Sequence, residues 1–221
     1  MYNDPLCPFC DITTEKKIFR WINAIPKDLI SFNRIILYEN EYFVIIPDIS
    51  PIVEYHVLII PKLHYQSISE IPIDSDIYIA DAREFIKNLY LDMPDKEVIF
   101  FEHGSCNITG SACINHAHLH CLPLEKKEIR QLQLKVDKIN DGSDLFVENE
   151  SYLSFEISGR TYKWADNWGI KQFLRKTIAE TVRRPNRNNW QGSLSVDSEK
   201  EITKKWLNNV LIKFKKSHED Q

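Results

Sequence analysis

The chain has 221 residues, of which 43% are hydrophobic and 27% are charged, and its formal net charge is −4. This composition excludes a largely disordered chain and indicates one large globular domain, or a compact domain with an extension. The small negative charge provides no overall attraction to nucleic acids or membranes, and the longest apolar runs, such as 57–60, are too short to span a bilayer.

The N-terminal segment contains two of the five cysteines, in the order Cys7-Pro8-Phe9-Cys10. It does not have the basic and then apolar pattern of a signal segment, so we expect a cytosolic protein. In a reducing compartment this spacing is typical of half a zinc site or of a redox pair. A redox pair normally follows a strand, and no strand-like run precedes Cys7, which favours zinc.

The expected elements alternate between strands and helices along the chain. Strands are predicted at 35–38, 42–46, 56–60, 98–101, 114–122 and 152–157, with Pro123 ending the fifth of them, and helices at 74–91, with Asp74 as the N-cap, at 170–182 and from Asp197 onward. Residues 125–141 are polar with weak periodicity and are expected to form a connector. This order predicts an α+β fold rather than a doubly wound parallel sheet.

Three histidines at alternate positions, His116, His118 and His120, form the most informative segment. In a strand their imidazoles would share one face and lie ~7 Å apart, with apolar residues on the other face. The pattern is compatible with partly exposed histidines on an edge strand, with a metal site made of all three, or with nucleophilic catalysis. Imidazole is neutral for much of the time at pH 7, which favours the nucleophilic interpretation.

The segment resembles the motif of the histidine-triad (HIT) superfamily, whose members hydrolyse or transfer nucleotides. A second segment agrees, because Asp48-Ile49-Ser50-Pro51 followed by residues 56–62 and His64 is similar to the ribose-binding strand and the next strand of that family. The resemblance covers residues 7–124. It implies a HIT-like fold with an antiparallel sheet and a long helix, a catalytic domain at 1–124, and a C-terminal extension of strand and helices at 125–221 packed on or beside it.

The resemblance also implies a role for each matching residue. His118 would be the nucleophile that forms a nucleotidyl-histidine intermediate, and His120 and His56 would support the phosphate site. Asp48 would accept hydrogen bonds from the ribose hydroxyls, and Ile49 would press on the base. By itself, Asp48 would be interpreted as a turn residue before Pro51.

In the zinc-containing branch of the family, which is similar to galactose-1-phosphate uridylyltransferases, four ligands recur, and they match Cys7, Cys10, His64 and His116. A closed set of two cysteines and two histidines implies a structural zinc that joins the N-terminal segment to the catalytic strand.

Two departures from the family pattern concern the nucleotide site. The usual glutamine is missing from the loop before the first histidine, so Ser111 would supply the hydroxyl. Glu102 stands where relatives have Asn or Gln, and a carboxylate beside phosphate is repulsive unless it is protonated or paired.

The extension contains a basic segment, with eight Lys or Arg and two acids between Arg160 and Trp190. Gln172 and Arg175 are candidates for recognising distal phosphates or the leaving group, and the interleaved aromatics could stack on nucleic-acid bases. Alternatively, the segment is a solvated helix face whose tryptophans pack on the core.

Together these features predict a nucleotide hydrolase or nucleotidyltransferase that acts at the α-phosphate of a nucleotide or dinucleotide. The alternatives are an enzyme that removes 5′-adenylate from nucleic acid and a nucleotide-binding protein without catalysis. Net charge disfavours a nucleic-acid partner, no membrane partner is expected, and a homodimer is compatible with the resemblance.

Overall fold

The computed structural model describes residues 7–15, 35–104, 114–140, 151–165, 172–190 and 194–219. In chain order its helices and strands are α1 (Pro8–Glu15), β1 (Tyr38–Glu39), β2 (Phe43–Pro47), β3 (Val57–Pro61), η3 (Ile68–Glu70), η4 (Ile73–Ser75), α2 (Asp76–Leu89), β4 (Lys96–Gly104), β5 (Leu119–Glu125), α3 (Lys126–Asn140), β6 (Tyr152–Ile157), β7 (Arg160–Ala165), α4 (Phe173–Thr181), η5 (Pro185–Arg187) and α6 (Asp197–Glu219). Within these ranges, no helix has both the length and the apolar character that a bilayer-spanning segment needs.

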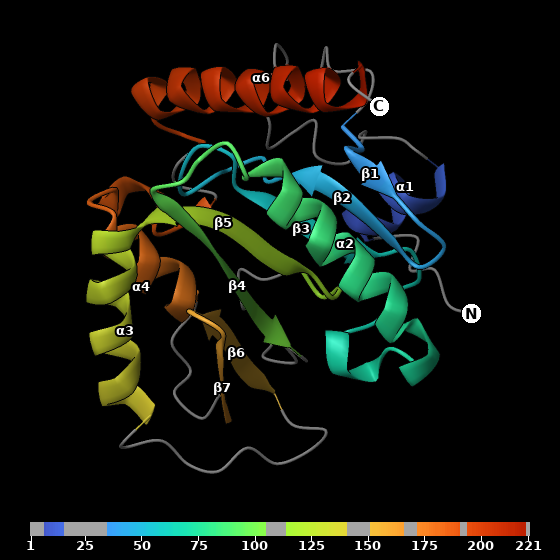
Figure 1. Cartoon of the computed structure of the whole chain (residues 1–221), viewed down its shortest axis with the longest axis horizontal. Helices are drawn as coiled ribbons and strands as arrows, with labels where there is room; N and C mark the ends of the chain where they lie inside the picture. The colour runs from blue at the N-terminus through green and yellow to red at the C-terminus, as the bar shows by residue number, and fades with distance from the viewer. Residues whose placement is uncertain are drawn as a thin grey trace.

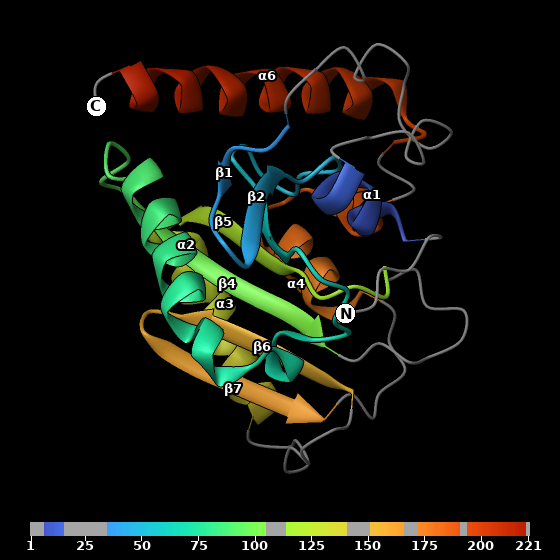
Figure 2. The same ribbon diagram turned by 90° about the vertical axis from the view of Figure 1, so that its right-hand side faces the viewer.

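One antiparallel sheet of seven strands, in the order β1-β2-β3-β5-β4-β6-β7, organises the fold. Helix α2 covers one face of the sheet, and α1, α3 and α4 cover the other, while α6 runs along one side of the molecule (Figures 1 and 2). The fold is therefore α+β, as predicted, because neighbouring strands run in opposite directions and no helix connects parallel strands.

The two faces of the sheet follow from strand alternation. On one face, Leu58, Phe101 and Leu122 pack with α1, α3 and α4, and on the other, Ile59 and Phe100 pack with α2. Because both faces are covered, the central strands are apolar on both sides, and all five residues of β3 are buried.

The histidine segment differs from the prediction in where its strand lies. Strand β5 begins at Leu119 rather than at 114, and it continues through Pro123 to Glu125. Pairing of β5 with β3 ends at Cys121, so Pro123 pairs only with Val98 of β4. A proline is tolerated there because one side of the strand no longer needs a backbone donor.

Three expectations about the second half of the chain are corrected. Residues 126–140 form helix α3 rather than a connector, because Ile129, Leu132 and Val136 make a narrow apolar stripe that packs in the core. The helix expected from 170 begins at Phe173, since Gln172 has a left-handed backbone with φ of 54°.

Strand β7 was not predicted. It pairs with β6 through a tight turn at Ser158 and Gly159, whose φ angles are 50° and 73°. A Ser-Gly pair between two strand-like runs is the sequence signal for such a hairpin. The seven-stranded sheet thus continues past residue 124 through β6 and β7, and the division at 124/125 stays a prediction.

Helix α2 is slightly shorter than expected. It begins at Asp76 after the short helix η4, and the N-cap residue is Ser75 rather than Asp74. The N-terminal helix α1 was not predicted either; it positions the two cysteines at its start.

Candidate functional site

The three histidines of the motif point to two adjoining places in the structure. His116 is buried among the N-terminal cysteines, whereas His118 and His120 line a pocket. The ring centroids of His118 and His120 lie 4.9 Å apart, closer than the ~7 Å of an ideal strand, because the chain is extended but not paired before Leu119. A metal site made of all three imidazoles is not among the ligand clusters of the described residues.

The first place is a cluster of four metal-binding side chains, Cys7, Cys10, His64 and His116, whose donor atoms all lie within 4.8 Å of one another. The Sγ atom of Cys7 lies 3.3 Å from Nδ1 of His116, and Sγ of Cys10 lies 3.4 Å from Nδ1 of His64. Zinc bond lengths and tetrahedral angles place sulfur and nitrogen ligands about 3.6 Å apart. The donor set and its spacing therefore fit zinc.

The protonation state of His116 also fits a metal ligand. Its Nε2 lies 2.9 Å from the carbonyl oxygen of Pro61 and must donate to it, so in the neutral ring Nδ1 carries the lone pair. Burial raises the pKa of the Cys7 thiol to about 12. The thiolate therefore needs a compensating cation in this position, and a bound metal would supply one.

The orientation of His118 follows from one hydrogen bond. Its Nδ1 lies 2.7 Å from the carbonyl oxygen of His116, and since a carbonyl only accepts, Nδ1 carries the proton. In the neutral ring the lone pair is then on Nε2. The ring also packs edge-on against Phe9, with centroids 5.3 Å apart, so two neighbours limit its rotation.

A second chain of hydrogen bonds sets the tautomers of His56 and His120. The backbone N–H of Ile52 donates to Nδ1 of His56 over 3.1 Å, so His56 carries its proton on Nε2 and donates it to Nδ1 of His120 over 3.0 Å. His120 must then carry its own proton on Nε2. Phe101 stacks on the His120 ring with centroids 4.2 Å apart, which fixes the direction of this donor.

Both rings are neutral near pH 7. Burial lowers the pKa of His56 to about 4, and it lowers the pKa of His120 well below its ordinary value, with His118 and His56 adding to the effect. Desolvation disfavours the imidazolium form, which is the physical cause in both cases. The two rings therefore act as oriented dipoles rather than as charges.

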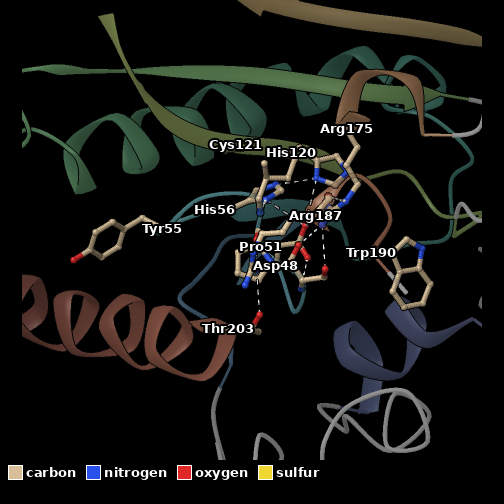
Figure 3. Close-up of polar contacts among 12 residues, drawn as sticks. Asp48, Pro51, Tyr55, His56, His120, Cys121, Arg175, Arg187, Trp190 and Thr203 are labelled. Carbon is tan, nitrogen blue, oxygen red and sulfur yellow. Dashed lines mark hydrogen bonds and ion pairs between the residues drawn. The ribbon is translucent and has the colours of Figure 1, made fainter. Parts of the chain in front are cut away.

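Asp48 lies at the end of β2 and is only 5% exposed. Burial opposes its ionisation, but His56, Arg175 and the N–H of Ser50 together lower its pKa below the ordinary range. Arg175 comes from α4, and its Nη1 lies 3.4 Å from Oδ2 of Asp48. Figure 3 shows Asp48 between the His56–His120 pair and the two arginines Arg175 and Arg187.

The pocket that contains these groups is mostly apolar. Its polar side chains are Asp48, His103, His118, His120, Gln172 and Arg175, and its apolar ones are Phe9, Ile12, Ile35, Ile46, Pro47, Ile49, Leu58, Phe101, Ile114, Leu153, Phe173, Leu174 and Trp190. Helices α1 and α4 supply opposite walls, and the sheet supplies the floor. An apolar pocket with few oriented polar groups at one end is typical of a small-molecule site.

Two predicted nucleotide-binding residues need comment. Glu102 is not in the pocket, because Phe101 and His103 point into it and strand alternation turns Glu102 to the opposite face. There it accepts hydrogen bonds from the hydroxyl of Tyr152 and the N–H of Ile68, both at 2.7 Å, and burial raises its pKa to about 7. Ser111 lies outside the described residues.

The basic segment divides among several environments. Lys163 lies over the ring of Tyr152, Arg187 is fully buried, and Trp164 packs in the core. Gln172 lines the pocket, where its Oε1 accepts a hydrogen bond from the N–H of Trp190 over 3.3 Å.

Sequence reasoning missed Phe9 and Phe173 as pocket residues, and it missed Arg187. The only signal for Phe9 was its position between the two cysteines of a metal-binding segment. Nothing in the local sequence distinguishes Arg187, which is fully buried, from its exposed neighbours Arg183 and Arg184.

Comparison with known proteins gives consistent sequence relatives. The family model for the HIT domain matches residues 32–127. A HIT-like protein of Chlamydia pneumoniae is 31% identical over 88 residues, which are 39% of this chain and 77% of that protein. Adenylylsulfatase HINT3 of Arabidopsis thaliana is 28% identical over 111 residues, 46% of this chain and 55% of its own length, so the chain spans about half of that relative.

Solved structures show partial likeness. The histidine triad nucleotide-binding protein of Candida albicans has a TM-score of 0.40 at 24% identity, with 60% of this chain and 95% of that chain covered. A zinc-bound histidine triad family protein of Mycobacterium smegmatis has a TM-score of 0.39 at 22% identity, with 55% and 76% covered. Family membership is therefore decided by the sequence matches.

Proposed function

This chain belongs to the HIT domain family, and on that premise we propose that it is a nucleotide hydrolase or nucleotidyltransferase that acts at the α-phosphate. The observation that supports this most strongly is the tautomer of His118. Its Nδ1 proton is held by the carbonyl of His116, so Nε2 is the nucleophilic atom, on a ring that lines the pocket.

In the proposed first step, the lone pair on Nε2 of His118 forms a bond to the α-phosphorus while the bond to the leaving group breaks. The electron pair of that bond departs with the leaving group. The ring becomes positively charged as it bonds to phosphorus, and its Nδ1–H donates more strongly to the carbonyl of His116. This carbonyl thus stabilises the charge that develops on the nucleophile.

His120 supplies the matching donor on the other side of the reaction. Its Nε2–H is fixed by the hydrogen bond from His56 and by stacking on Phe101, and it would stabilise negative charge on the phosphoryl oxygens. Because both rings are neutral, they provide this donor without a competing proton transfer. In the second step water, or another acceptor, displaces Nε2 and restores neutral His118.

The apolar half of the pocket is proposed to hold the nucleoside. Ile49 and the wall from α1 and α4 would enclose the base, and Asp48 at the pocket's polar end would accept hydrogen bonds from the ribose hydroxyls. The name of the Arabidopsis relative, an adenylylsulfatase, supports an adenylyl group as the first substrate to test. Gln172 is a candidate for contact with the leaving group.

We also propose that Cys7, Cys10, His64 and His116 hold a structural zinc ion. Zinc would join α1 to the segment that carries His118, two residues from the His116 ligand. All four protein ligands are present, so the site is closed and has no position for substrate. The metal would hold the site together without taking part in the reaction.

The test is a trapping experiment with a nucleotide labelled at its α-phosphate. A nucleotidyl-histidine makes the label acid-labile and protein-bound in the wild-type chain, and not in His118→Ala. Nucleotide binding without trapped label and without turnover would contradict catalysis and leave a binding protein. Removal of 5′-adenylate from nucleic acid is a second reaction to assay, and preference for that substrate over small nucleotides would change the proposed substrate class.

A further inference from the structure

Arg175 from α4 contacts the ribose-binding loop, and this contact joins the C-terminal extension to the pocket. The guanidinium is buried, with 5% of the residue exposed. Its Nε donates to the carbonyl of Arg187 over 3.1 Å, its Nη2 donates to the carbonyl and the Oγ of Ser50, the latter over 3.0 Å, and its Nη1 faces Asp48. All three nitrogens therefore have protein acceptors, and the group has one orientation.

Asp48 is held from two sides. One carboxylate oxygen, Oδ1, accepts the N–H of Ser50 over 2.8 Å, and the other, Oδ2, faces Arg175 at 3.4 Å. A charge-assisted hydrogen bond of full strength would be about 2.7–2.9 Å long. The longer separation gives Asp48 a compensating charge while Oδ2 keeps the capacity to accept a hydrogen bond from a ligand.

No other permanent positive charge contacts this carboxylate among the described residues. His56 and His120 lie 3.4 and 3.7 Å from Oδ2, but both rings are neutral near pH 7. A buried carboxylate without a cation would take up a proton rather than stay ionised. Arg175 therefore determines whether Asp48 is present as the better acceptor.

The rest of the extension holds Arg175 in place. Arg187, whose carbonyl accepts from Arg175, donates to the carbonyl of Pro51 and to the hydroxyl of Thr203. It also pairs with Glu199 over 2.7 Å, so α6 is connected to the loop after Asp48 through two successive arginines. The dashed contacts in Figure 3 follow this connection.

We propose that Arg175 is a positioning residue that holds Asp48 ionised and oriented toward the ribose hydroxyls, which makes the C-terminal extension part of the nucleoside site. This rests on the proposed function, since it assumes that a nucleotide binds in the pocket. The extension would then contribute to specificity for ribose through one contact rather than only to stability.

The test compares two ligands that differ only in the ribose hydroxyls, AMP and 2′,3′-dideoxy-AMP, by calorimetry on the full chain. The wild type should bind AMP about tenfold more tightly, since hydrogen bonds to an ionised acceptor are strong. Arg175→Met should reduce this ratio to within about twofold of one, with little change for the dideoxy ligand. Lys176→Met, which removes an exposed charge from the same helix, should keep the wild-type ratio.

The pH dependence of the ratio distinguishes positioning from a general loss of structure. Effects on the phosphate and on other titrating groups cancel in the ratio because both ligands share them. In the wild type the ratio should stay constant from pH 8 to pH 5, and in Arg175→Met it should fall as Asp48 takes up a proton. Arg175→Lys, which keeps the charge but not the three-way contact, should restore the ratio in part.

The outcomes separate the two proposals. If the wild type binds neither ligand, the proposed function is wrong and this inference falls with it. If the wild type binds both equally, or if Arg175→Met keeps the wild-type ratio at every pH, only this inference is overturned. Should Arg175→Met fail to fold, as judged by its thermal melting, Arg175→Lys decides: a wild-type ratio with a wild-type pH profile overturns the proposal.

Discussion

Nε2 of His56 lies 3.0 Å from Nδ1 of His120, and the backbone N–H of Ile52 on the far side of His56 determines which ring owns the shared proton. His56 must donate, so His120 presents its own Nε2–H. The carbonyl of His116 acts on His118 in the opposite sense, because it takes the Nδ1 proton and makes Nε2 a nucleophile. Two neighbouring histidines thus hold opposite tautomers, one suited to donate and one suited to attack.

Replacement of the proposed nucleophile should abolish turnover. His118→Ala is expected to lower kcat for release of AMP from an adenylyl phosphoramidate at least about a thousandfold, because no covalent intermediate can form. Since His118 is only half-buried, its thermal melting should stay close to that of the wild type. Retention of more than a tenth of wild-type turnover would exclude His118 as the nucleophile.

The stability of the protein should fall in mildly acidic solution because of His56. The folded-state pKa of about 4 is below the ordinary 6.5, so the unfolded chain binds a proton that the folded chain does not. The stabilising contribution is complete above pH 6.5 and decreases as pH falls toward 4, by about 3 kcal/mol in total.

Urea unfolding measured between pH 7.5 and pH 4.5 tests this for the wild type and for His56→Asn, in which the amide oxygen can still accept the Ile52 N–H. The difference in unfolding free energy between the two should shrink as pH falls. Other acid-sensitive groups, the cysteine-histidine cluster included, are common to both proteins. A difference that is constant across this range would contradict the assigned pKa shift.

The metal content should depend on the four clustered side chains. The purified chain is expected to hold about one zinc ion, and Cys10→Ala should lose most of it and melt at least about 5 °C lower. Cys121→Ala is the matched control, because Cys121 is also buried but lies in the sheet outside the cluster. Elemental analysis of the dialysed proteins measures the outcome, and equal zinc in the two variants would rule out the proposed ligand set.

The buried pair of Arg187 and Glu199 should be important for stability. Arg187→Met leaves Glu199, which is 6% exposed, without its cation, and it removes the donor to Pro51. We expect a loss of about 3 kcal/mol in the free energy of unfolding, measured by urea denaturation. Arg184→Met, at an exposed neighbour, should cost less than about 1 kcal/mol. Similar losses in the two variants would show that Glu199 finds another partner.

Much of the site could be predicted from residue type and spacing. Four metal-binding side chains and three alternate histidines are local patterns, and the structure brings the cysteines together with His64 and His116, and His118 with His120. The strands that carry them were recognisable because apolar runs bounded by Pro and Asn leave few other choices. Their register was not, since pairing between strands depends on residues far apart in the chain.

The sequence by itself determined the family, the α+β order of elements and the identity of the histidines, because these depend on local composition and spacing. Only the tertiary structure decided that Glu102 turns away from the pocket and that Arg175 turns toward it. The first follows from the register of β4 in the sheet, and the second from packing of α4 against the loop after β2, across 127 residues of chain. A buried charge is stabilised by whatever partner the fold brings within reach, and that partner has no signature in the neighbouring sequence.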